Sequence, residues 1–303
     1  MIVREISTNN INQSNKKKGL KAFTPYLFLL PHLIFFAIFV VYPFLYGIYI
    51  SFTNFDLMNS PKFCFFDNYI KILTFGSKYS KDFFAGLLHT FIYTVTAVPL
   101  IVFVPLILAV LLYAIKNEKL RNFFQSILYA TSILSVSTVV LIFTWLLDRD
   151  NGLFNNLFMV DINFKGNEIL TWVAIISLTL WSGVGGNMII FLSSISSIPK
   201  SQYEAASLDG ANAVNRFFRL TLPSLRFPLT FSLITGVIGG FNVFGQPFLF
   251  GGKVGSYETV MMEVYEYAFG SSPMAGMASA MSVLLGLIIL AASVVQFKLM
   301  KEK

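Results

Sequence analysis

The chain has 303 residues, of which 55% are hydrophobic and only 12% are charged, and its formal net charge is +7. A soluble globular domain carries about 25% charged residues, so this composition excludes an ordinary soluble enzyme, a disordered chain and a nucleic-acid-binding domain. The single cysteine, Cys64, excludes an intrachain disulfide and a cysteine-based metal cluster. These exclusions leave an all-α integral membrane protein.

Six stretches of the chain contain no Asp, Glu, Lys or Arg, and each is longer than the roughly 20 residues that a transmembrane helix needs. They are 22–55, 83–115, 122–147, 169–199, 227–252 and 267–297. We therefore predict a tail over 1–21 and a single six-helix membrane domain over 22–303. An even number of spans places both termini on the same side of the membrane.

The positions of the basic residues predict which side that is. With the N-terminus inside, 15 of the 22 Lys and Arg residues lie in inside segments and 7 lie in outside loops, whereas acidic residues number 5 inside and 10 outside. This bias predicts a multi-pass protein of the inner (cytoplasmic) cell membrane with both termini in the cytoplasm. The cluster formed by Lys16, Lys17, Lys18 and Lys21 then anchors the topology on anionic lipid rather than on nucleic acid.

Several kinds of functional group are missing from the sequence. The predicted spans contain no acidic residue, which disfavours an ion-coupled transporter, and their ionisable groups of the usual coupling type are His32 and His89. The only Gly-Lys pair, Gly252-Lys253, precedes Val254 rather than Ser or Thr, so there is no P-loop. We expect no catalytic site, no metal site and no cofactor in this chain, and any uphill transport must use another subunit.

The inside segment 200–226, between the fourth and fifth spans, is longer than most helix connections and predicts a helix-turn-helix. Ser201 and Glu204 have the spacing of a capping box, and Gly210 is placed to end the first helix after about Asp209. A second helix is expected over about 212–219, ending before Pro223.

Small side chains distinguish the first of these helices. Ala205 and Ala206 leave one side without bulk, so that another protein can approach closely. The alternative is an amphipathic helix that rests on lipid headgroups, but such a helix would carry large apolar residues and Lys. The composition therefore favours docking.

The segment resembles the EAA loop of binding-protein-dependent ABC importer permeases. The similarity comprises Glu204-Ala205-Ala206, Gly210 after three residues, and Leu220-Thr221-Leu222-Pro223. Further motifs are similar to the carbohydrate branch, the MalF-like or UgpA-like permeases: Tyr42-Pro43, Phe66-Asp67-Asn68-Tyr69, Phe241-Asn242-Val243-Phe244 and Tyr265-Glu266-Tyr267-Ala268-Phe269.

This resemblance implies a type I importer permease with a cytoplasmic coupling helix-turn-helix between its fourth and fifth helices. It implies four partners: a second permease subunit, ABC ATPase subunits that hold ATP and Mg, an extracellular solute-binding protein, and the lipid membrane. The ATPase-coupling residues would be Glu204, Ala205, Ala206, Asp209 and Gly210. Glu204 could serve as a cap for its helix, as a charge that contacts the ATPase, or as both.

Uncharged polar groups and glycines in the fourth and fifth spans are the candidates for the substrate path. They are Thr179, Trp181, Ser182, Gly183, Asn187, Gly240, Asn242 and Gln246. Amides and hydroxyls can bind sugar hydroxyls and an aromatic face can stack on a pyranose, but small residues can equally mark close helix packing. The absence of Lys and Arg from the spans favours a sugar or oligosaccharide. Glycerol-phosphate or another small solute is the alternative, and a channel or membrane scaffold is a third reading.

Overall fold

The computed structural model describes residues 26–252 and 257–301, and within this part every element longer than an isolated β-bridge is a helix. Four helices are long and apolar enough to cross a membrane: Tyr26–Ser51, α4 (Lys78–Ala114), α8 (Glu168–Ser196) and Ala275–Met300 within α14 (Ala275–Lys301). Two bent helix pairs bring the number to six, which confirms the predicted six-span helical fold. The predicted tail 1–21, its lysine cluster and Lys253 lie outside the described residues.

The first span begins at Tyr26 and includes a π turn, η1 (Ala37–Val41), followed by α2 (Tyr42–Ser51). After it, α3 (Asp67–Leu73) leads into α4, which continues through Pro99 and Pro105. The first span is almost entirely uncovered by the rest of this chain, because only 6% of its most apolar window is buried. That helix therefore faces lipid or another subunit.

The third span is sharply bent. It consists of α5 (Glu118–Ala130), the 3-10 turn η2 (Thr131–Ile133) and α6 (Val136–Leu146), with an angle of 101° between its two parts. Leu134 adopts an extended conformation, and the Ser135 hydroxyl then accepts from the backbone N–H of Thr138, 3.3 Å away, as an N-cap. Residues 122–147, which were predicted as one uninterrupted span, therefore contain the start of a second helix, α6.

The fifth span is shorter than its charge-free stretch of 227–252. Helix α12 (Arg226–Phe241) ends before Asn242, and a separate π turn, η4 (Pro247–Gly251), follows. The break is tolerated because the Thr259 hydroxyl donates to the freed Val243 carbonyl over 3.0 Å. The sixth span begins at Ala275 rather than 267, because the preceding residues close a separate helix, α13 (Val260–Phe269).

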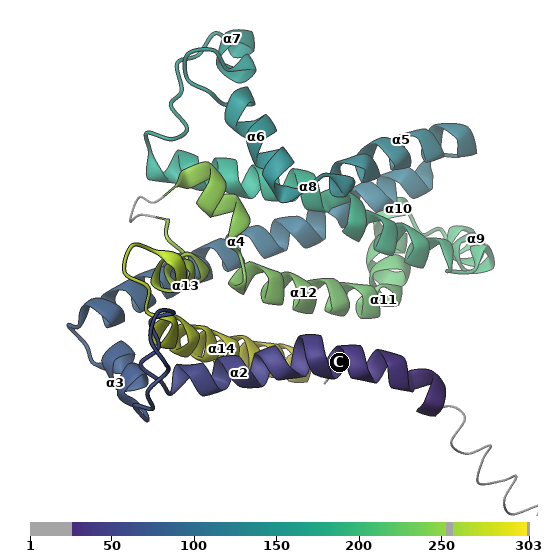
Figure 1. Ribbon diagram of the computed structural model, residues 1–303. Coiled ribbons are helices and arrows are strands. Elements are labelled where there is room, and N and C mark those ends of the chain that lie inside the picture. Colours follow the sequence, from purple (N-terminus) through teal and green to yellow (C-terminus); the bar gives the residue numbers. More distant parts are fainter. Residues whose placement is uncertain (1–25, 253–256, 302–303) are drawn as a thin grey trace, which may run out of the picture.

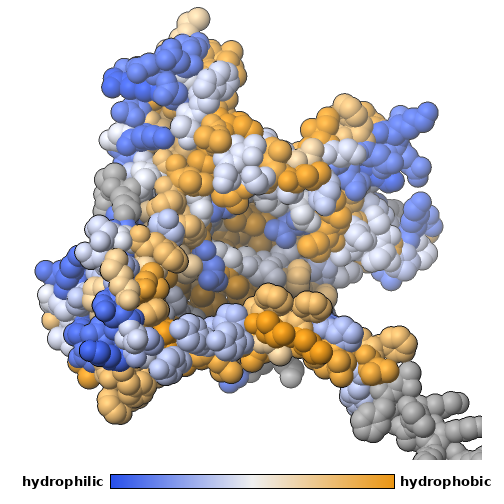
Figure 2. Space-filling model, in the orientation of Figure 1, coloured by the Kyte–Doolittle hydropathy of each residue, from blue (hydrophilic) through white to orange (hydrophobic). Residues whose placement is uncertain are grey.

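Helix α4 is central to the bundle and packs against α8, α12 and α13 (Figure 1). Its buried residues Val102, Leu106 and Ala109 form one core cluster with Met188 and other apolar residues of α8. Helices α9 (Lys200–Leu208) and α10 (Ala213–Arg216) lie at one end of the bundle and α3 and α13 at the other (Figure 1). Figure 2 shows hydrophilic residues gathered at these ends and hydrophobic residues between them.

Candidate functional site

Helix α9, which carries the predicted coupling residues, begins two residues earlier than the predicted capping box implies. Its first residue is Lys200 and its N-cap is Pro199, which makes no side-chain cap hydrogen bond. The predicted capping box of Ser201 and Glu204 is therefore wrong, because Ser201 already lies within the first turn. Pro199 sets this start, since the residue before a proline is disfavoured in the helical region and α8 must end before it.

The predicted end of α9 is confirmed. Gly210 adopts a left-handed φ of +76° directly after the C-cap residue Asp209. The backbone N–H of Ala211 donates to the Ala206 carbonyl over 2.9 Å, and that of Gly210 donates to the Ser207 carbonyl over 3.1 Å. These two bonds form a Schellman motif, which requires a residue that tolerates positive φ at the Gly210 position.

The second helix of the segment is longer than predicted. Asn212 is its N-cap, accepting from the Asn215 backbone N–H over 2.8 Å, and the helical stretch then runs through Ser224. It passes Pro223 because a π turn, η3 (Phe217–Thr221), precedes α11 (Leu222–Ser224) and changes the local hydrogen-bond spacing. The chain then bends by 68° into α12, so the turn-helix is joined directly to the fifth span.

One face of α9 is fixed to the rest of the protein. The hydroxyls of Tyr203 and Thr221 hydrogen-bond over 2.8 Å, and Arg216 Nη1 donates to the Ser207 hydroxyl over 2.6 Å. Tyr203 and Ser207 are four residues apart, so they share a helix face with Lys200 and Glu204. Ala205 lies on the opposite side of the helix and Leu208 borders the fixed face at the end of α9, where it is 89% exposed; we call the exposed surface of these two residues the free face of α9.

A cavity of about 600 Å³ lies behind this fixed face. The ends of α4 and α8 form its apolar wall, while α5, α9 and α10 contribute charged side chains. Glu204 lines this cavity together with Lys200 and Tyr203. The Glu204 side chain therefore lies beside the body of the protein as well as being exposed to solvent.

Four residues of the predicted substrate path lie close together on α8: Thr179, Trp181, Ser182 and Gly183. The Tyr93 hydroxyl of α4 donates to Thr179 Oγ1 over 3.1 Å, and the Ser182 hydroxyl donates to the Thr179 carbonyl. A Cβ built at Gly183 would meet nothing within 4 Å, so packing does not require glycine there. Trp181 is partly exposed and packs edge-on against Phe143, with 5.8 Å between the ring centroids.

Two other predicted path residues hold helices together. Asn187 Nδ2 donates to the Ile101 carbonyl of α4 over 3.1 Å, and Asn187 Oδ1 accepts from the Ser232 hydroxyl of α12 over 3.3 Å. A Cβ at Gly240 would lie 2.8 Å from Thr94 Oγ1, so this glycine allows α12 to approach α4 closely. Asn187 and Gly240 thus have a packing role that is visible in this chain.

Asn242 and Gln246 flank the break in the fifth span. The exposed Asn242 amide donates to the Ile238 carbonyl over 2.8 Å, while Gln246 is half-buried. Within the part of the chain that the structure describes, the Gln246 amide has no hydrogen-bonding partner. Both amides therefore keep polar atoms available beside the irregular backbone.

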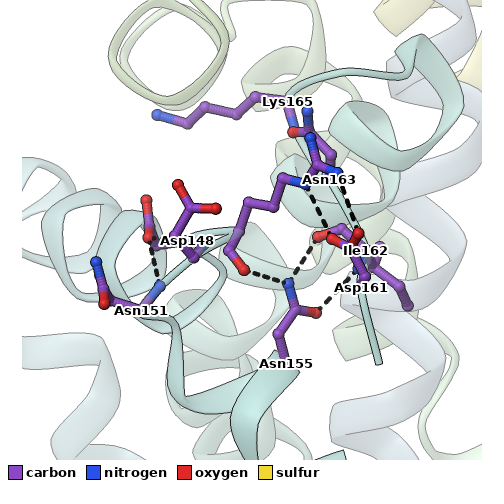
Figure 3. Close-up of polar contacts among 9 residues, drawn as sticks. Asp148, Asn151, Asn155, Asp161, Ile162, Asn163 and Lys165 are labelled. Atoms are coloured by element: carbon purple, nitrogen blue, oxygen red, sulfur yellow. Dashed lines mark hydrogen bonds and ion pairs between the residues drawn. The ribbon is translucent and has the colours of Figure 1, made fainter. Parts of the chain in front are cut away.

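The loop between α6 and α8, which is predicted to lie outside, contains α7 (Leu153–Phe158) near its tip. Figure 3 shows Asn155 at its centre: Nδ2 donates to the carbonyls of Arg149 and Ile162 over 3.0 and 2.9 Å, and Oδ1 accepts from the Ile162 N–H. Arg149 also forms a two-bond ion pair with Asp161, at 2.9 and 3.0 Å. Next to this network Met159 is 93% exposed.

At the end of the bundle opposite α9, α13 presents a carboxyl group with a strongly shifted pKa. Burial and the neighbouring Glu258 carboxyl, which hydrogen-bonds to it, raise the pKa of Glu263 to about 8. Asp82 of α4 adds to this shift, while Lys78 opposes it. Asp82 Oδ2 also accepts from the Tyr267 hydroxyl over 2.6 Å. This cluster therefore binds a proton more readily than isolated carboxylates would.

Sequence reasoning missed Leu208, Tyr203 and Asn155. Leu208 had a detectable signal, since it is a large apolar residue among the small and polar residues of 200–210. Tyr203 and Asn155 had none, because their roles depend on partners that only the fold brings to them.

Comparison with known proteins relates this geometry to transporters. The family described as "Binding-protein-dependent transport system inner membrane component" matches residues 72–301. A probable ABC transporter permease protein, YesP of Bacillus subtilis (strain 168), is 34% identical, with 88% of this chain and 87% of YesP covered. The arabinooligosaccharides transport system permease protein AraP of Halalkalibacterium halodurans is 30% identical, with 95% of this chain and 93% of AraP covered.

A solved structure has the same fold over nearly the whole chain. It is a bacterial ABC transporter involved in the import of the acidic polysaccharide alginate, and its matching chain is 20% identical with a TM-score of 0.79. The match covers 95% of this chain and 99% of that chain.

Proposed function

Since this chain belongs to the family of binding-protein-dependent transport system inner membrane components, we propose that it forms the pathway of an importer for a neutral sugar or oligosaccharide. The chain is a permease subunit of an ABC transporter, and ATP hydrolysis belongs to a separate subunit. The observation that carries the proposed substrate is the 30% identity, over 95% of the chain, to a permease for arabinooligosaccharides.

The residues of α8 support this substrate class. Thr179 and Ser182 offer hydroxyls and Gly183 leaves open space beside them, with no Lys, Arg, Asp or Glu between 169 and 199. Uncharged hydrogen-bonding groups suit sugar hydroxyls, whereas an anionic solute would favour a cation in the pathway. Gln246, with a free amide at the break in the fifth span, is the residue of that span most suited to contact the solute.

We assign ATPase coupling to the free face of α9. Ala205 and Leu208 present a small and a large apolar surface to solvent, and Asp209 and Gly210 end the helix beside them. Ala206 is half-buried and Glu204 lines the inner cavity, so these two residues support the position of α9. A movement of the ATPase subunits would pass through α9 and the helical stretch Ala213–Ser224 to α12 and the pathway, as a rigid-body change.

The remaining partners follow from the same assignment. A second permease subunit would complete the pathway and cover the exposed first span, and ATPase subunits would bind at the cytoplasmic end with α9 and α10. The solute-binding protein would then dock at the opposite end, where α3, α7 and α13 lie. Both termini would be cytoplasmic.

Uptake by the complete transporter in proteoliposomes tests the substrate class. We expect neutral arabinose- or glucose-based oligosaccharides to stimulate ATP hydrolysis in the presence of the binding protein, and Thr179→Val to weaken this stimulation. Preferential stimulation by glycerol-phosphate or by an acidic oligosaccharide would contradict the proposal. ATPase activity that no solute stimulates would favour a scaffold.

A further inference from the structure

We propose that the cavity behind α9 is a binding site for the phosphate headgroup of an anionic phospholipid of the cytoplasmic leaflet. The cavity has a volume of about 600 Å³, which lies within the range of small-molecule sites. It is distinct from the sugar pathway, because its walls are the cytoplasmic ends of helices rather than their membrane-embedded middles.

The charge of the cavity favours an anion. Its lining includes the four basic residues Lys116, Arg121, Lys200 and Arg216 and only two carboxylates, Glu118 and Glu204. Arg121 approaches Glu118 only to 3.9 Å. Among the described residues, no carboxylate lies within ion-pair distance of Lys116, Lys200 or Arg216. The lining of this open, solvent-accessible cavity thus carries two positive charges in excess.

The shape of the cavity favours a ligand with an apolar part. Val110 and Ala114 come from the last turns of α4, Ile195 comes from the last turn of α8, and Phe217 comes from η3. These side chains continue directly from the membrane-spanning part of the helices. A phosphate could contact the basic residues while the glycerol and the first acyl carbons lie against this apolar wall.

The position of the cavity along the helices agrees with such a ligand. The charge-free stretches end at Ile115 and Pro199, and the basic residues follow immediately in the predicted inside segments. This is the depth at which the hydrocarbon core meets the headgroups. Basic pockets between transmembrane helices on this side of a membrane are established sites for anionic headgroups.

The ligand would also connect elements that otherwise touch little. Lys116 belongs to the turn after α4 and Arg121 to the first turn of α5, whereas Lys200 and Arg216 belong to the segment with α9 and α10. The rings of Tyr113 in α4 and Tyr203 in α9, with centroids 6.1 Å apart, already join these parts. A phosphate held by both sets of cations would brace the inner face of α9 while leaving Ala205 and Leu208 free.

Native mass spectrometry of the full chain tests the site with phosphatidylglycerol as the probe and phosphatidylcholine as the reference lipid. The test variant combines Lys116→Gln, Arg121→Gln and Lys200→Gln. The matched control combines Lys119→Gln, Arg219→Gln and Arg226→Gln, which removes the same charge from the same face but from residues that do not line the cavity. We expect phosphatidylglycerol to bind at least tenfold more weakly to the test variant and unchanged to the control.

Equal weakening in both variants would overturn the proposal, since general attraction to the basic surface would then explain binding. An equal affinity of the wild-type chain for phosphatidylcholine would also overturn it. If glycerol 3-phosphate competes as strongly as the lipid, the phosphate site stands but its natural ligand is a soluble phosphate ester.

A second measurement on the unaltered chain protects the test against misfolded variants. A photoactivatable phosphatidylglycerol should crosslink to peptides that contain 110–121 and 195–221. Crosslinks that avoid both peptides would contradict the site.

Discussion

Gly210 shows how one backbone angle can determine the direction of a functional helix. Its φ of +76° is strained for any other residue, yet a Cβ there would meet no neighbouring atom. Gly210→Val should therefore cost about 1–2 kcal/mol through the backbone alone. We expect the Schellman motif to open, α9 to tilt, and substrate-stimulated ATP hydrolysis by the complete transporter to fall sharply while the protein still reaches the membrane.

The control for this change is Gly286→Ala in α14, which also meets no atom within 4 Å but does not have a positive φ. It should leave ATPase coupling unchanged. Full stimulation and full ATPase retention in the Gly210→Val variant would contradict the assignment of α9 as the coupling element.

The raised pKa of Glu263 predicts how the stability of the protein depends on pH. Because its pKa is raised from 4.5 to about 8, the folded protein binds this proton more tightly than the unfolded chain does. The stabilisation is complete below about pH 4.5 and is lost as the pH rises through about 8. We expect the Tm in detergent to decrease from about pH 5 to about pH 8, and Glu263→Gln to flatten this decrease.

Glu168→Gln is the control, because Glu168 is exposed in the first turn of α8. It should leave the pH dependence as in the wild type. A Glu263→Gln variant whose Tm still decreases as steeply would show that other groups set the dependence.

At the residue scale, the sequence identified which residues matter more reliably than it identified what each of them does. Gly210 was identifiable because few residues other than glycine fit a helix end with positive φ. Ser201 was misassigned because a capping box has the same spacing whether or not the helix has already started after a proline two residues upstream. Asn187 looked like a solute contact, and only the fold revealed that Ile101 and Ser232 satisfy its amide.

At the scale of elements, α9 has two faces with different expected sensitivities. Leu208→Asp changes the free face, so it should release the ATPase subunits in a pull-down without changing how the permease folds. Tyr203→Phe changes the fixed face and removes only the 2.8 Å hydrogen bond to Thr221. We expect the loss of this hydrogen bond to reduce the free energy of unfolding by about 1 kcal/mol, which lowers the Tm slightly while the ATPase stays bound.

The opposite pattern, ATPase loss in Tyr203→Phe and retention in Leu208→Asp, would mean that the two faces are assigned the wrong way round. Ala205→Trp offers a second test of the free face, because it adds bulk without a charge.

The outer loop around α7 depends on one buried amide. Asn155→Ala removes three hydrogen bonds and leaves the carbonyls of Arg149 and Ile162 without a side-chain donor, at about 1–3 kcal/mol for each group that stays buried. We expect faster proteolysis within residues 148–165 when protease is added to right-side-out membrane vesicles. Asn156→Ala, at the exposed neighbouring position, should be cut like the wild type.

The elements themselves were partly predictable. Charge-free stretches located all six spans, because membrane insertion requires apolar length. They did not reveal the 101° bend at 134–135 or the end of α12 at Phe241, since both depend on hydrogen bonds that satisfy the freed backbone locally. Nor did they separate α13 from α14, because residues 267–274 lack charge without being helical throughout.

For the whole molecule, the orientation in the membrane can be read with two reporter positions. Leu208 and Met159 are 89% and 93% exposed and lie at different ends of the chain's fold. In a Cys64→Ser background, Met159→Cys should react with an impermeant thiol reagent in intact cells, whereas Leu208→Cys should react only after permeabilisation. Ready labelling of the Leu208→Cys variant in intact cells would overturn the predicted orientation.

The break after α12 has a consequence for the order in which the protein is made. The carbonyl of Val243 relies on the hydroxyl of Thr259, which is fully buried and is synthesised 16 residues later. When Val243 leaves the ribosome, Thr259 follows 16 residues behind it and is still inside the exit tunnel, so it cannot yet donate, and an unsatisfied carbonyl in lipid is costly. The segment must therefore enter the bilayer as a more regular helix and acquire its break only afterwards, when Thr259 reaches Val243 and the Val260 N–H reaches Thr90. The irregular backbone beside Gln246 is thus a late product of assembly.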